Sequence, residues 1–153
     1  PQSDREQEEA LGTEQTQMLH LYPKNVYLGA GCRKHTPEEK IETQIRTYLS
    51  EAGISITQIL QAASIDLKKE EPGLLAFCEK YQIPFVTYSK EELERAKGTF
   101  TPSAFVSKIT GVDNVCERSA SLSSDGGAFI MRKQAAEGVT AACTIKKWSV
   151  NFE

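Results

Sequence analysis

Short apolar segments separated by polar stretches run along this chain and predict a set of buried strands. Three of them, at residues 26–28, 59–67 and 85–88, are rich in the β-branched and aromatic residues that strands favour. Two more, at residues 128–133 and 138–148, are separated only by Gln-Ala-Ala-Glu. Consecutive strands this close in sequence predict an antiparallel hairpin near the end of the chain.

The first stretch between strands has the apolar spacing of an amphipathic helix. This helix is expected from Thr36 to about Ala52, because Thr36 can act as the N-cap and Gly53 ends the pattern. Pro37 would then occupy the first helical position. The side chains expected to face the sheet are Ile41, Ile45, Tyr48, Leu49 and Ala52.

Later segments predict further helices. Pro72 suits the first turn of a second helix, and Pro84 stops it. Ser89 and Glu92 have the spacing of a capping box and begin a third helix. Two more short helices are expected over residues 103–109 and 116–122. The second helix is expected to bury Leu74, Leu75, Phe77 and Cys78.

Strands that alternate with helices predict an α/β fold. We expect three layers, α/β/α, around a mixed, mostly parallel sheet that the C-terminal hairpin extends with antiparallel strands. Residues 1–21 carry many Gln, Glu and Asp residues and few large apolar ones, which predicts a flexible tail or interdomain linker. Residues 22–153 are then a single domain.

Composition narrows the class of protein. The chain has 153 residues, of which 39% are hydrophobic and 25% charged, as in a soluble globular domain. The net charge of −3 argues against a nucleic-acid partner, and no apolar run is long enough to predict a membrane partner or a signal peptide. Four scattered cysteines and two histidines predict no zinc site. Buried, reduced thiols would be typical of a cytoplasmic protein.

The run after the first strand predicts an anion-binding turn. Gly29 and Gly31 allow a sharp turn or a close approach to a ligand, and the start of the next helix would direct backbone N–H groups toward it. Arg33 and Lys34 add two positive charges. Many α/β domains share such a turn without binding anything. The run also lacks the remaining residues of a dinucleotide or P-loop motif.

Cys32 lies within this run. A thiol at a helix N-terminus beside Arg33 and Lys34 is expected to have a lowered pKa. The alternative is a small residue that fills a tight turn. His35 is either a solvated loop residue or a substrate contact.

Four motifs in order resemble one family. They are GAGCR at 29–33, ASIDLK at 63–68 with EPGL at 71–74, GV at 111–112 with VCE at 115–117, and GVT at 138–140. This chain resembles, over about residues 25–147, the C-terminal domain of CbiG, the cobalt-precorrin 5A hydrolase of anaerobic cobalamin synthesis, and its single-domain relative CobE. It departs from the family pattern at His35, where glycine is more common, and at Ser121, where an aliphatic residue is.

The resemblance implies a substrate and a reaction. The family's reaction opens a lactone on the A ring of cobalt-precorrin 5A and releases a two-carbon fragment as acetaldehyde. No cofactor held by protein ligands is implied, because cobalt arrives inside the corrinoid. Upstream domains of the same polypeptide are implied as partners. The residues expected to bind the substrate are Gly29, Gly31, Cys32, Arg33, Lys34, Thr36 and Arg118.

Lactone opening also requires a base, and carboxylates are the candidates. Asp66 ranks first, because it stands at the expected carboxyl end of a strand, where open α/β sheets bind their ligands. Glu117 ranks second, ahead of Glu70 and Glu71. The alternatives are a cap or loop hydrogen bond for Asp66 and a helix N-terminal charge for Glu117.

Two hypotheses of function follow. The chain is either a domain of the lactone-opening hydrolase or a non-catalytic corrinoid-binding module or carrier like CobE. A thiol enzyme built on Cys32, with His35 three residues later, ranks below both. Under either leading hypothesis, residues 29–33 and the strand end near Asp66 should lie on one edge of the sheet and line one cleft.

Overall fold

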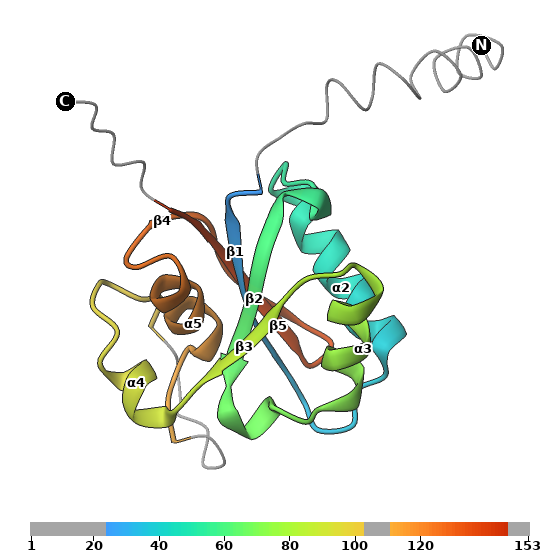
Figure 1. Cartoon of the computed structure of the whole chain (residues 1–153), viewed down its shortest axis with the longest axis horizontal. Helices are drawn as coiled ribbons and strands as arrows, with labels where there is room; N and C mark the ends of the chain where they lie inside the picture. Colours follow the sequence, from blue (N-terminus) through green and yellow to red (C-terminus); the bar gives the residue numbers. More distant parts are fainter. Residues whose placement is uncertain (1–23, 103–110, 147–153) are drawn as a thin grey trace, which may run out of the picture.

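A five-stranded sheet forms the centre of the molecule (Figure 1). The computed structural model describes residues 24–102 and 111–146. The strand order is β3-β2-β1-β5-β4. The strands are β1 (Val26–Cys32), β2 (Ile59–Ile65), β3 (Phe85–Tyr88), β4 (Ala128–Ala136) and β5 (Val139–Ile145).

Strand directions match the expected mixed sheet. β1 pairs in parallel with β2, and β2 with β3, whereas β5 is antiparallel to both β1 and β4. β4 therefore runs in the same direction as β1, β2 and β3, and only β5 is reversed within the described sheet. The carboxyl ends of the parallel strands meet at one edge, which is where α/β sheets commonly bind ligands.

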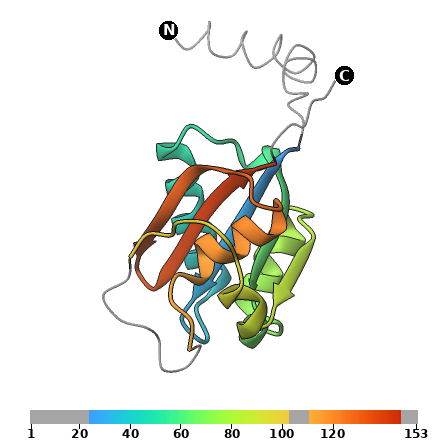
Figure 2. The ribbon, with the colours of Figure 1, turned by 90° about the vertical axis from the view of Figure 1, so that its left-hand side faces the viewer.

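Helices cover both faces of the sheet and complete the predicted three layers. Figure 1 shows α2 and α3 on one face and α4 and α5 on the other, and Figure 2 shows α5 lying across the sheet. The helices are α2 (Glu38–Glu51), α3 (Pro72–Lys80), α4 (Lys90–Glu94) and α5 (Val115–Ser123), with short 3₁₀ turns η1 (Ile56–Gln58) and η2 (Asp66–Lys68).

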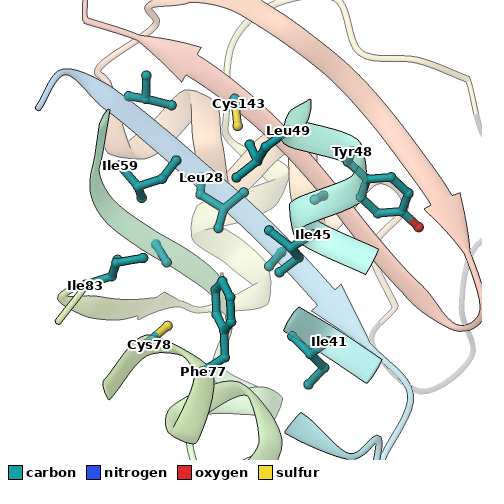
Figure 3. Close-up of a cluster of buried hydrophobic side chains, with 14 of the residues drawn as sticks. Leu28, Ile41, Ile45, Tyr48, Leu49, Ile59, Phe77, Cys78, Ile83 and Cys143 are labelled. Carbon is teal, nitrogen blue, oxygen red and sulfur yellow. The ribbon is translucent and has the colours of Figure 1, made fainter. Parts of the chain in front are cut away.

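The main core lies between the sheet and the α2/α3 layer (Figure 3). Leu28 of β1 belongs to one buried cluster with the α2 side chains Ile41, Ile45 and Leu49, and Phe77 of α3 completes it. All five are 2% exposed or less. Burying each such side chain contributes about 1.5–3 kcal/mol, so the predicted apolar stripe of α2 fixes that helix on the sheet.

The other layer depends on a very close approach of helix to strand. A Cβ atom added to Gly29 in the middle of β1 would lie 1.8 Å from the Cys116 carbonyl oxygen of α5. Only glycine allows the backbone of α5 to rest on the strand here. Gly29 and Gly31 therefore belong to β1, and the prediction that they form a turn is wrong.

Helix boundaries differ from the predictions at a few residues. Pro37 and not Thr36 is the N-cap of α2, and the Thr36 hydroxyl donates instead to the Arg33 carbonyl oxygen at 2.6 Å. Ala52 is exposed at the end of α2, and Leu75 on α3 is 39% exposed, so neither belongs to the core. The capping box of Ser89 before α4 is confirmed.

Two strand ends also differ. β2 stops at Ile65, and Leu67 lies 57% exposed in η2 rather than in the strand. The hairpin turns at Glu137 and Gly138, whose φ angles are 54° and 78°, so β4 continues to Ala136 through the expected connection. Two consecutive positive φ angles are the geometry of a tight turn that matches the twist of the paired strands.

Some predictions fall on residues that the structure does not describe. The tail at 1–21, the helix at 103–109 and the last residues of the strand expected to reach 148 lie outside the described ranges. Within those ranges, every helix is too short or too polar to cross a lipid bilayer.

Candidate functional site

A cleft of about 860 Å³ opens at the edge of the sheet where β1 and β2 end. Its walls come from four separate segments: the end of β1 with the loop after it, the end of β2 with η2, the loop that enters α5, and the β4–β5 hairpin. The predicted meeting of residues 29–33 with the strand end near Asp66 at one sheet edge is confirmed by the parallel register of Gly29 with Ala63.

The loop after β1 is held in place from two sides. The Arg33 N–H donates to the Gly138 carbonyl oxygen of the hairpin at 3.0 Å. His35 has a left-handed φ of 66°, and its N–H donates to Glu71 Oε2 at 2.7 Å. Glu71 lies just before α3. The loop after β1 is therefore hydrogen-bonded both to the start of α3 and to the β4–β5 hairpin.

Positive charge predominates on the walls. Arg33, Lys34 and Lys133 line the cleft and form no ion pair with any described carboxylate. The acidic lining residues are all paired: Glu71 with Lys68 at 3.6 Å, Asp113 with Arg118 at 3.0 Å and Glu137 with Lys40 at 3.5 Å. The cations that lack a partner favour an anionic ligand.

Two further lining residues, Ser64 and Cys32, are polar or ionisable. Ser64 is completely buried, and its Oγ has no hydrogen-bond partner among the described residues. The half-buried thiol of Cys32 lies near Lys68 and Glu71. Burial raises the pKa of Cys32, although the charge of Lys68 opposes this. The prediction of a lowered pKa is wrong because Cys32 ends a strand and lies at no helix N-terminus.

The helix whose start reaches the cleft is α5 and not α2. Asn114 is its N-cap, in a left-handed conformation with φ 52°, and its Oδ1 accepts from the Glu117 N–H at 3.3 Å. Asparagine tolerates this conformation better than most residues. Val115 and Cys116, in the first turn of α5, line the cleft.

Glu117 is buried behind this helix start and is fully engaged. Its carboxylate accepts from the N–H and the hydroxyl of Thr101 at 2.7 and 2.6 Å, from the Lys133 N–H at 2.7 Å and from Asn114 Nδ2 at 2.9 Å. Burial works to raise the pKa of Glu117, but these hydrogen bonds hold it below the ordinary value. The carboxylate joins α5, β4 and the segment around Thr101.

Of the residues predicted to act on substrate, four meet at the cleft. Gly31, Cys32, Arg33 and Lys34 line it. The described lining does not include Gly29, Thr36, Asp66, Glu117 or Arg118. Asp66 is exposed in η2, next to lining residues on both sides.

Arg118 is occupied elsewhere. Its guanidinium donates to the Asp113 carbonyl oxygen and carboxylate at 2.9 and 3.0 Å and to the Leu93 carbonyl oxygen at 3.2 Å. It also lies over the Phe100 ring, with 4.8 Å from Cζ to the centroid. These contacts join the start of α5 to the end of α4.

The structure adds Ser64, Lys68 and Lys133 to the site. Ser64 and Lys68 both lie in the ASIDLK motif at 63–68, which was the available signal in the sequence for these two residues. Lys133 reaches the cleft only because the hairpin folds back beside β1.

Metal ligands are not gathered anywhere in the described part of the chain. No group of three His, Cys, Asp or Glu side chains there could hold an ion. The four cysteines are free thiols, and burial raises the pKa of Cys78 and Cys116 to about 12.

One family of known proteins matches this chain over almost the whole sheet. Residues 26–144 match the family described as Cobalamin synthesis G C-terminus. The chain belongs to this family. The matched range runs from the first residue of β1 almost to the end of β5, so the Cobalamin synthesis G C-terminus domain contains every wall of the cleft.

Named relatives of this Cobalamin synthesis G C-terminus domain are of two kinds. The cobalt-precorrin-5A hydrolase of Priestia megaterium is 35% identical over 123 residues, which are 80% of this chain and 33% of that protein. The protein CobE of a Sinorhizobium species is 32% identical over 117 residues, 75% of this chain and 76% of CobE. The chain thus spans about a third of the hydrolase and most of CobE.

A solved structure supports the same fold. The crystal structure of CobE, described as a protein from the cobalamin biosynthetic pathway, superposes with a TM-score of 0.72 at 25% identity and covers 79% of this chain and 89% of CobE.

Proposed function

We propose that the cleft binds a corrinoid precursor of the cobalt-precorrin 5A class. We further propose that the chain is the C-terminal domain of a protein that opens the A-ring lactone and releases acetaldehyde in the anaerobic cobalamin pathway. The observation that carries this proposal is the positively charged cleft at the carboxyl edge of the sheet, inside the matched family domain.

Size and charge support this ligand class. A cleft of about 860 Å³ lies in the range of pockets that enclose small molecules and cofactors, about 300–1,000 Å³. A corrinoid precursor has acetate and propionate groups around its rim, which suit Arg33, Lys34 and Lys133. Cobalt enters the site as part of the substrate.

The chemistry of lactone opening requires a base that activates water at the ester carbonyl. Within the described residues, the Glu71 carboxylate is held by His35 and Lys68, and the Glu117 carboxylate accepts from five donors, so both are already engaged. The Asp66 side chain forms no ion pair or hydrogen bond with another described residue, but it is exposed and lies outside the lining of the cleft. We therefore assign binding to this domain and the base to another part of the complete hydrolase.

The alternative is a CobE-like module or carrier that binds the corrinoid without a reaction. It is favoured by the match to CobE over 76% of that protein's length. The coding sequence around this chain separates the two proposals, because further domains upstream belong to the hydrolase. The free thiols support a cytoplasmic location in either case.

Removal of two cleft cations tests the binding proposal. Replacing Arg33 and Lys34 together by Ala should weaken binding of cobyrinic acid, a corrinoid with free carboxylates, by about tenfold at low salt. Added salt should weaken binding to the parent protein more than to the variant, because these contacts are partly exposed ion pairs. Absorbance titration measures both effects.

The matched control removes the same two charges elsewhere. Arg95 and Lys97 are exposed and lie outside the described lining, so replacing both by Ala should leave the affinity close to that of the parent. Equal affinities for the Arg33/Lys34 variant and the parent at low salt would refute the proposed role of these cations.

A further inference from the structure

Ser64 is an anomaly in the strand that forms the floor of the cleft. Its side chain is 0% exposed, yet the hydroxyl makes no hydrogen bond within the described structure. A buried hydroxyl without a partner costs about 1–3 kcal/mol. Native proteins pair nearly all such groups. Because Ser64 lines the cleft, a bound ligand can supply the missing partner.

Lys68 is a second incompletely satisfied group in the same wall. Its side chain is 16% exposed, and its Nζ lies 3.6 Å from Glu71 Oε1, beyond normal hydrogen-bond distance. The other Glu71 oxygen accepts from the His35 N–H at 2.7 Å, so the carboxylate cannot move freely toward the ammonium group. The ammonium group of Lys68 is paired in charge with the Glu71 carboxylate, but its N–H groups remain available to donate to another acceptor.

We propose that Ser64 and Lys68 together form a subsite that binds one carboxylate of the bound corrinoid. We call this pair of residues the seat. The inference rests on the proposed function and specifies how that ligand is oriented. Both residues line the cleft, four positions apart across the turn from β2 into η2. A hydroxyl and an ammonium group can donate to the two oxygens of one carboxylate, and charge-assisted bonds of this kind are strong. Glu71 is the positioning residue, since it holds Lys68 at the wall.

The seat differs in its exposure to solvent from Arg33 and Lys34, which we call the rim cations. Ser64 is fully buried and the Lys68 side chain is 16% exposed, whereas Arg33 and Lys34 are exposed on the loop after β1. Salt screens exposed ion pairs strongly and buried ones weakly. The contribution of the seat should therefore persist at salt concentrations that abolish the contribution of the rim.

The test compares cobyrinic acid with its heptamethyl ester, which has the same ring but no free carboxylate. Ser64→Ala and Lys68→Met should each weaken binding of the acid by about tenfold, at low and high salt alike, and leave binding of the ester within about twofold. The double variant should bind only slightly more weakly than either single variant, because both residues hold the same carboxylate. Lys69→Met, at the exposed neighbouring lysine outside the described lining, is the charge-matched control and should bind as the parent does.

Thermal unfolding of the free protein separates a binding role from a structural one. Ser64→Ala should raise the melting temperature, because it removes a buried hydroxyl that has no partner. If Lys68→Met fails to fold because Glu71 is left without its cation, the binding of acid and ester by Ser64→Ala is sufficient to test the seat. The seat is refuted if the parent binds the acid and Ser64→Ala binds it equally well, or if acid and ester are weakened alike. A parent that binds neither corrinoid overturns the proposed function as well.

Discussion

Glu117 and Ser64 are both completely buried polar side chains, but their surroundings give them opposite roles. The Glu117 carboxylate accepts hydrogen bonds from Thr101, Asn114 and Lys133, whereas the Ser64 hydroxyl accepts and donates none within the described residues. A saturated carboxylate has no free lone pair directed at a substrate. We infer that Glu117 stabilises the fold and that the Ser64 hydroxyl is available to hydrogen-bond with a ligand.

Glu117→Gln should destabilise the protein. The amide NH₂ would face backbone N–H groups that now donate to an oxygen, so at least one buried donor loses its acceptor. Loss of charge-assisted buried bonds of this kind should lower the free energy of unfolding by about 2–3 kcal/mol. Urea denaturation at neutral pH measures the loss, and Glu94→Gln at an exposed position is the control.

The same variant should change how stability depends on pH. The folded-state pKa of Glu117 lies below its ordinary value, so the folded protein favours the charged form. This stabilisation is complete above the unfolded pKa of about 4.3 and is lost as the pH falls through the folded value. Glu117→Gln should therefore lose less stability than the parent on acidification below about pH 5. Parallel pH profiles for parent and variant would contradict this assignment.

Helix α5 is the element that connects the fold to the cleft. It lies on β1 at Gly29 and directs its first turn, with Val115 and Cys116, toward the ligand site. Ser119 on the same helix reaches the sheet, because its hydroxyl can donate to the Ala63 carbonyl oxygen of β2 at 3.4 Å. The position of one cleft wall thus depends on a glycine in the middle of a strand.

Gly29→Ala should displace α5 and destabilise the protein. Its Cβ would lie 1.8 Å from the Cys116 carbonyl oxygen, and a backbone atom cannot rotate away. Overpacking of this kind costs about 1–3 kcal/mol or more. At Gly31 the obstacle is the Thr140 side chain oxygen at 2.7 Å, which can change rotamer, so Gly31→Ala should lose less stability. Similar losses for both variants in chemical denaturation would argue against the close helix approach.

The molecule as a whole brings the cleft together from segments far apart in sequence. The end of β1, the end of β2, the start of α5 and the β4–β5 hairpin converge because the central strand β1 is flanked by β2 and β5. Ligand recognition therefore requires the intact sheet. The role of Asp66, the predicted base, therefore has to be tested in the complete polypeptide.

Asp66→Asn in the complete polypeptide separates binding from catalysis. Asp66 is exposed and outside the described lining, so we expect acetaldehyde release from cobalt-precorrin 5A to stay within about threefold of the parent rate. The amide nearly preserves shape but cannot act as a base. A variant that binds substrate normally yet releases no acetaldehyde would move the active site onto this domain.

Much of the fold could be predicted because it follows from local patterns. The stripe Ile41, Ile45, Tyr48 and Leu49 predicted α2, and the capping box at Ser89 predicted α4, since both signals are complete within a few residues. The expected connection Gln134-Ala135-Ala136-Glu137 is too long, because β4 continues to Ala136 and the turn is made by Glu137 and Gly138. Glu-Gly is not among the residue pairs that typically signal a turn with two positive φ angles. Threonine is a common N-cap residue, but the Thr36 hydroxyl donates to the Arg33 carbonyl oxygen and does not cap α2.

By itself, the sequence determined the order of strands and helices, the mixed sheet and the family, because periodicity and short motifs act over neighbouring residues. It also indicated Cys32, Arg33 and Lys34 as cleft residues, since they lie in the glycine-containing run after the first predicted strand segment, and all three line the cleft. Only the tertiary structure decided that Gly29 serves helix packing, that Glu117 is saturated and that Ser64 is left without a partner. Each of these depends on contacts between segments distant along the chain, and no local pattern records which distant atom will lie opposite a given side chain.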